Sequence, residues 1–201
     1  MTDHQDECSC GEQHRHNTQP NPFTDPIREA AYREFVLQLF RMGCVTVPHS
    51  IETTVNFVGV ACLGMCPPGP ADRMVTLRAL MFELARLASD ISGGREPQFR
   101  VAIRCEDPDH DHPPMRELDD GHGGTPEQEF GTDLMKAFFT AVSEGDLASA
   151  VRVGDAISHE ADGTDRHPEG YFVALLGNCL ASLAYTTVQG SPMHPRALFE
   201  D

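Results

Sequence analysis

Four residues of metal-binding type gather near the start of the chain. They are Cys8, Cys10, His14 and His16, in the pattern C-x-C-x3-H-x-H. Thiolates and imidazoles are the usual ligands of zinc, so four of them in one short segment could wrap a Zn²⁺ ion. The spacing is tighter than in a zinc finger, whose ligand pairs stand about a dozen residues apart. Two interpretations stay open: a zinc site, or a flexible tail over residues 1–23 that chelates metal only incidentally.

A second group of candidate ligands follows a predicted strand. It consists of Cys105, Asp109, His110 and His112. Such donors suit zinc and similar metals, and functional sites are common where a strand ends. The same residues border or lie within a stretch rich in Asp, His, Pro and Gly, residues 106–124, for which a solvated linker is the simpler interpretation. No cofactor is expected apart from zinc at one of these two clusters.

The familiar catalytic motifs do not occur in the sequence. There is no phosphate-binding glycine loop with its lysine, since Lys136 is the only lysine and falls within a predicted helix. There is no G-x-S-x-G elbow, and His159–Glu160 lacks the second histidine of H-E-x-x-H. A cysteine–histidine nucleophilic pair needs no proximity in sequence. An enzyme of unknown class therefore stays open as an alternative.

The charge balance narrows the classes of partner. The chain has 31 acidic and 15 basic residues among 201, for a formal net charge of −16. Such a surface repels phosphate backbones and anionic lipid, so nucleic acid and membrane surfaces are not expected partners. The uncharged run from Thr53 to Met65 is too short to cross a bilayer. No signal peptide is recognisable, and the seven cysteines are expected to be reduced thiols of a cytoplasmic protein.

The clearest element that could position these residues is a helix over residues 71–92. Its apolar residues recur at three- and four-residue steps and are Met74, Leu77, Leu80, Met81, Leu84, Leu87, Ala88 and Ile91. This spacing places them on one side of an α-helix. We expect Arg86 and Ser89 on the opposite side. The apolar face is expected to pack against a first helix and against residues 50–65.

The segments before this helix carry one clear signal and one ambiguous signal. A first helix is expected over residues 26–42, with Asp25 as its N-cap and Gly43 as its end. The run 51–65 has strand-like Thr, Val and Phe content, yet its apolar residues follow helical steps, and we favour a buried helix. Cys62 and Cys66 in and after this run are expected to pack in the core rather than to bind metal.

Strands are expected to be few. Residues 98–105 alternate apolar and polar side chains, which is typical of a half-buried strand. The nearest candidate partner is the short β-branched segment 44–47. The sequence thus predicts at most a small sheet of two or three strands.

Residues 125–190 are expected to be helical again, with Gly145 and Asp146 at a tight turn and a last helix from Pro168 to Gly190. The turn, with Ala150 after it and Leu176–Gly177–Asn178 in the following helix, resembles tetratricopeptide-type helical pairs over residues 133–189. That resemblance implies stacked helix hairpins and a concave surface that binds peptides. Gly154 departs from the pattern, because a large aromatic residue is usual at that position.

The sequence as a whole predicts a mainly α protein: a helical bundle with at most a small two- or three-stranded sheet and C-terminal helical hairpins. The expected organisation is a tail (1–23), a helical unit with a short strand (24–105), an acidic linker (106–124) and a second helical unit (125–201). The favoured function is that of a non-enzymatic adaptor or regulatory protein that binds protein partners through helix faces. A metal-binding or metal-responsive protein that uses the Cys/His clusters is the alternative.

Overall fold

The protein is a helical bundle, as the sequence predicts. The computed structural model describes residues 19–92, 102–103, 116–117, 126–163 and 168–190. Within these residues there are six helices and one pair of short strands. The helices are α1 (Pro26–Thr46), α2 (Ile51–Met65), α3 (Pro70–Ser92), α4 (Pro126–Glu144), α5 (Leu147–Gly163) and α6 (Pro168–Gly190). None of these described helices is both long and apolar enough to cross a membrane.

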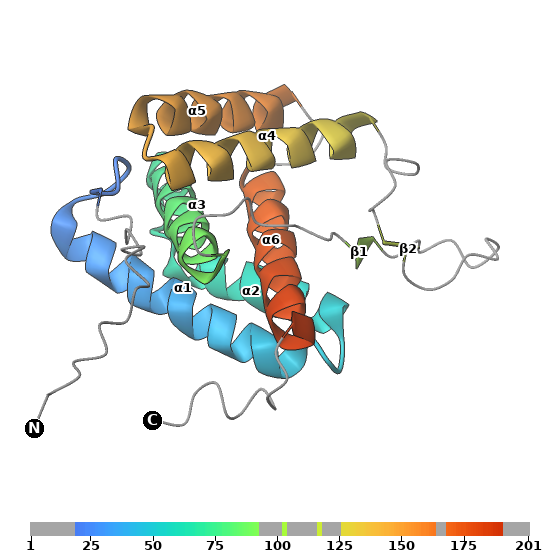
Figure 1. The fold of residues 1–201 in the computed structure, drawn as a ribbon. Helices are drawn as coiled ribbons and strands as arrows, with labels where there is room; N and C mark the ends of the chain where they lie inside the picture. Colours follow the sequence, from blue (N-terminus) through green and yellow to red (C-terminus); the bar gives the residue numbers. More distant parts are fainter. Residues whose placement is uncertain (1–18, 93–101, 104–115, 118–125, 164–167, 191–201) are drawn as a thin grey trace, which may run out of the picture.

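The helices form three layers (Figure 1). The hairpin of α1 and α2 lies on one side, α3 and α6 stand in the middle, and the hairpin of α4 and α5 covers the other end. Helix α6 packs against α1, α2, α3 and α5, while α3 packs against α1, α4 and α6. The helical segments before and after the expected linker therefore share one hydrophobic core.

Local sequence signals set where several helices begin. The Asp25 side chain accepts hydrogen bonds from the backbone N–H groups of Ile27 and Arg28, both at 3.0 Å. Ser50 Oγ accepts from the N–H of Thr53 at 3.1 Å. These side chains satisfy backbone donors that have no partner within the helix. Gly145 adopts a φ of 76°, a left-handed conformation that glycine adopts without steric cost, and it makes the tight turn between α4 and α5.

Residues 51–65 are helical, which confirms the favoured interpretation of this ambiguous run. Its strand-like composition is overridden by packing, because α2 lies directly against α6. At Gly59 an added Cβ would come within 2.9 Å of the side chain of Val173. At Gly177 an added Cβ would come within 2.9 Å of the backbone oxygen of Val55. Glycine at these two positions lets the two helices approach closely.

The prediction for residues 43–47 is wrong. Helix α1 continues through Gly43 to Thr46, so residues 44–46 are helical and Val47 is the C-cap rather than part of a strand. Glycine suits this helical position because α6 passes close by: an added Cβ would lie 3.0 Å from the side chain of Leu180. The predicted strand over residues 98–105 therefore has a different partner from the expected segment 44–47. β1 (Ala102–Ile103) pairs antiparallel with β2 (Arg116–Glu117), which falls inside the expected linker.

Helix α3 is the centre of the core, and it is covered on more sides than its apolar stripe indicates. Leu77, Leu80 and Leu84 are buried as expected. Arg86 and Ser89, expected on a solvent-facing side, are buried as well. The cause is that α1, α4 and α6 all pack around α3. Polar side chains in this helix therefore need partners inside the protein.

Candidate functional site

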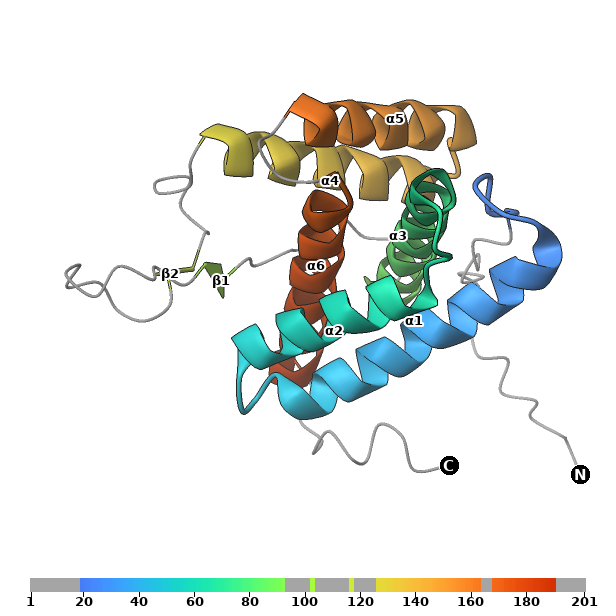
Figure 2. The same ribbon diagram turned by 180° about the vertical axis from the view of Figure 1, so that it is seen from behind.

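The outward side of the α1–α2 hairpin exposes apolar side chains. We define the outer hairpin face by Phe35, Met42 and Val45 on α1 and by Val60 and Leu63 on α2. The exposed fractions are 72% for Val60, 48% for Val45, 47% for Met42 and 43% for Leu63, and Phe35 is partly buried. Figure 2 shows the two helices lying side by side across α6. Single exposed apolar residues are ordinary, whereas several on two adjacent helices make this face a candidate for a contact surface.

This hairpin is also electrically neutral within a strongly acidic chain. No charged residue occurs from Thr53 to Ala71. Residues 26–71 contain three arginines and three glutamates, for a net charge of zero: Arg28, Arg33, Arg41, Glu29, Glu34 and Glu52. The net charge of −16 is therefore carried entirely by the rest of the chain. A partner protein meets less charge to desolvate at this face than elsewhere on the surface.

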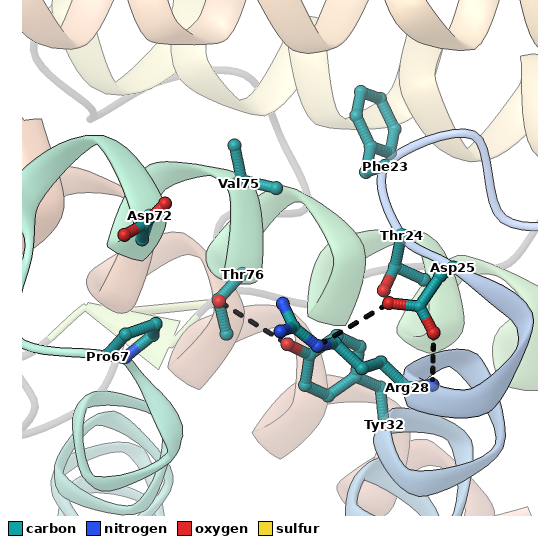
Figure 3. Close-up of a pocket in the computed structure, with 9 residues that line it drawn as sticks. All are labelled: Phe23, Thr24, Asp25, Arg28, Tyr32, Pro67, Asp72, Val75 and Thr76. Atoms are coloured by element: carbon teal, nitrogen blue, oxygen red, sulfur yellow. Dashed lines mark hydrogen bonds and ion pairs between the residues drawn. The ribbon is translucent and has the colours of Figure 1, made fainter.

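A small cleft lies between the start of α1 and the first half of α3 (Figure 3). Its volume is about 240 Å³, which is below the ~300–1,000 Å³ typical of small-molecule sites. The nine residues that line it are Phe23, Thr24, Asp25, Arg28, Tyr32, Pro67, Asp72, Val75 and Thr76. The cleft is therefore small, and the charged residues Asp25 and Arg28 line its mouth.

Four polar residues of the cleft interact in two pairs. The Tyr32 and Thr76 hydroxyl groups lie 3.4 Å apart, within reach of a hydrogen bond. At the mouth, Arg28 Nε lies 3.5 Å from an Asp25 carboxylate oxygen, and the other carboxylate oxygen caps α1. Hydrogen bonds from the α1 backbone, chiefly from Arg28 N–H, hold the pKa of Asp25 below its usual value. The Asp25 carboxylate thus serves to begin a helix.

A buried ionic network joins α1, α3 and the segment before α1. Arg86 Nη1 donates to Glu29 Oε1 at 2.6 Å and lies 3.6 Å from Glu83 Oε1. Arg33 reaches both carboxylates, with Nη2 2.6 Å from Glu29 and Nε 3.3 Å from Glu83. The Arg86 guanidinium also lies over the Phe82 ring, 5.8 Å from its centroid. Glu29, Glu83 and Arg86 are thereby paired with little access to water, while the Arg33 side chain is about half exposed.

Asn21 completes this network from the N-terminal side. Its side-chain Nδ2 donates to Glu83 Oε1 at 2.8 Å and to the backbone oxygen of Ala79 at 3.1 Å. Its backbone N–H donates to Glu29 Oε2 at 3.2 Å. The expectation of a flexible tail up to residue 23 is therefore wrong for this part, because Asn21 is buried and Phe23 packs against Phe82 and Phe138.

The two glutamates of the network titrate differently. Burial raises the pKa of Glu83, although Asn21 and the two arginines oppose that shift. For Glu29 the desolvation is outweighed by Arg86, the Asn21 N–H and Arg33, which hold its pKa below the usual value. Glu29 is therefore the firmly ionised member of the network, and Glu83 is the carboxylate whose charge is costly to bury.

The metal-ligand candidates lie outside the described residues. This applies to Cys8, Cys10, His14 and His16 and to Cys105, Asp109, His110 and His112. Among the residues that are described, no group of three or more His, Cys, Asp or Glu side chains could hold a metal ion. The two zinc sites remain predictions from sequence.

The four described cysteines are free thiols in or beside the core. Cys62 is buried as predicted, and burial raises its pKa to about 12. Cys66 is partly buried, and its thiol donates to the backbone oxygen of Cys62 at 3.2 Å. Burial also raises the pKa values of Cys44, to about 11, and Cys179, to about 12. These thiols are poor nucleophiles because they are not thiolates near neutral pH.

Comparison with known proteins returned no match: no family model, curated protein or solved structure resembles the chain significantly. The outer hairpin face was not identified from the sequence. Helical spacing alone does not say which side of a broadly apolar helix such as α1 is covered. The neutral charge of residues 26–71 was the available signal, since it contrasts with a net charge of −16.

Proposed function

We propose that the protein is a non-enzymatic adaptor or regulatory protein that binds a protein partner through the outer hairpin face. The observation that carries this proposal is the exposure of Met42, Val45, Val60 and Leu63 on two adjacent helices with no net charge. Apolar anchors surrounded by polar residues supply most of the binding energy in protein interfaces. Val60 and Leu63, one helical turn apart on α2, are suited to fill a pocket of the partner.

The fold supports the proposal because it holds this face rigid. Helix α2 is fixed on α6 by the close approach at Gly59 and Gly177, so its outward residues are presented without rearrangement. A preorganised surface loses less conformational entropy on binding than a mobile one. The net charge of −16 on the rest of the chain favours partners whose flanking surface is basic.

Site-specific photocrosslinking in the native host tests the proposal. A benzophenone amino acid placed at Val60 is expected to give a discrete adduct with one protein. The same amino acid at the exposed Ala156 on α5 serves as the control and should not give that adduct. Val60→Asp combined with Leu63→Asp should abolish the adduct formed from a benzophenone at Met42 while the circular dichroism spectrum is retained. Absence of any adduct from both Met42 and Val60 would refute the proposal.

A further inference from the structure

Helix α1 carries a second stripe beside its buried one, and its period is that of a coiled coil. Ala31, Phe35, Gln38, Met42 and Val45 follow one another at alternating four- and three-residue steps. All of them are exposed except Phe35, which is partly buried. The core-facing residues Val36, Leu39 and Phe40 lie on another side of the same helix. A stripe with an average period of 3.5 residues fits the corresponding stripe of another helix.

We propose that the partner seated on this stripe is the α1 helix of a second copy of this chain, packed antiparallel about a two-fold axis. The inference rests on the proposed function and names one occupant of the outer hairpin face. Two arguments favour a second copy over an unrelated helix. The first is charge: two chains of net charge −16 repel each other over most of their surfaces, but residues 26–71 are neutral.

The second argument is self-complementarity along α1. Glu34 and Arg41 are exposed, lie seven residues apart at the edge of the stripe, and carry opposite charges. In an antiparallel pair of α1 helices centred between residues 36 and 37, Met42 lies opposite Ala31 of the second copy and Phe35 lies opposite its Gln38. The same arrangement places Glu34 of each copy two residues from the level of Arg41 of the other, which is within reach of these long side chains. A two-fold interface requires such pairing of one surface with itself. Gln38, a polar residue within the stripe, donates from Nε2 to Glu34 Oε1 of the same helix at 3.0 Å and so holds that carboxylate beside the stripe.

Sedimentation equilibrium of the purified full-length chain tests the inference. The wild-type chain is expected to approach twice the chain mass as its concentration rises. E34R places like charges at both symmetric pairs, as does R41E, so each variant should weaken dimerisation by about tenfold or more. Both positions are exposed, and retained helical circular dichroism is the control for folding.

Mixing the two variants gives the decisive result. In an E34R–R41E pair every contact across the axis again joins opposite charges, so the mixture should dimerise at least as well as the wild-type chain. A chain that stays monomeric at all concentrations overturns the inference, and so does a dimer that is indifferent to both substitutions. If the purified chain is monomeric while Val60 crosslinks a different protein in the host, the second-copy inference fails and the proposed function stands.

Discussion

The contribution of the buried Arg86 to stability can be tested by the substitution Arg86→Met. Methionine keeps an unbranched side chain beside Phe82 but removes the positive charge that pairs with Glu29 and Glu83. The Arg86 side chain is 8% exposed, so water cannot replace the lost pairing. Removing one partner of a buried ion pair costs ~3–5 kcal/mol, because the remaining charges stay buried without compensation. We expect a loss of this size in the free energy of unfolding.

Arg33→Met provides the matched control within the same network. Arg33 contacts the same two carboxylates, but its side chain is 53% exposed, so solvent already screens its charge. An exposed pair contributes about 0–1 kcal/mol, and the loss should stay within that range. The difference between the two losses in free energy of unfolding therefore measures the effect of burial, because the residue type and the two carboxylate partners are the same.

Urea unfolding followed by far-UV circular dichroism at pH 7 measures both losses. The double variant Glu29→Gln with Arg86→Met should be less destabilised than the sum of the single variants, by ~1–3 kcal/mol, since it removes both charges of one pair. If Arg86→Met and Arg33→Met lower the free energy of unfolding by equal amounts, the network is not a buried ion pair in solution, and the reasoning from burial is refuted.

Three further predictions concern the core, the helix contact and pH. Leu80→Ala should lower the free energy of unfolding by ~2–5 kcal/mol in urea denaturation, while Val75→Ala on the same helix, half exposed, should change it by less than about 1 kcal/mol. Gly177→Ala should destabilise the chain because its Cβ meets the Val55 backbone oxygen, whereas Gly170→Ala in the same helix, with open space around it, should raise the melting temperature slightly; equal effects would contradict the close α2–α6 approach. Because the folded-state pKa of Glu83 is raised above 4.5, its contribution to stability is present below that pH and is lost as pH rises through the raised pKa. The free energy of unfolding of the wild type relative to Glu83→Gln should therefore be greater at pH 4 than at pH 7, and a difference that does not change with pH would count against this assignment.

The helices were predictable because their signals are local. Asp25 and Ser50 cap their helices in the way their side-chain chemistry dictates, and the stripe through Leu77, Leu80 and Leu84 is buried as its period indicates. What could not be predicted depends on contacts between distant segments. Residues 44–46 carry β-branched content but are helical, because α6 packs against this part of α1. The β1–β2 pair is too short for its β2 strand to show alternation.

The candidate site also depends mostly on contacts between segments that are distant in sequence. Asn21 lies in a polar stretch with no periodicity, and its burial depends on Glu83 and Ala79, which are about 60 residues away in sequence. Arg86 was assigned to the solvent side because a single stripe cannot show that a helix is surrounded. The outer hairpin face depends on which sides of α1 and α2 remain uncovered after α6 has packed. Apart from the neutral charge of residues 26–71, none of these features has a signature within one segment of sequence.

The central place of α6 has a consequence for how the chain matures during synthesis. Helices α1 and α2 both pack on α6, which is the last of the six to leave the ribosome. Until it emerges, buried residues of the first hairpin such as Val58 and Cys62 lack a covering helix. Chains that expose apolar surface for long periods tend to aggregate or to recruit chaperones. Nascent chains stalled before residue 168 should therefore associate with chaperones more strongly than chains stalled after residue 190 has emerged.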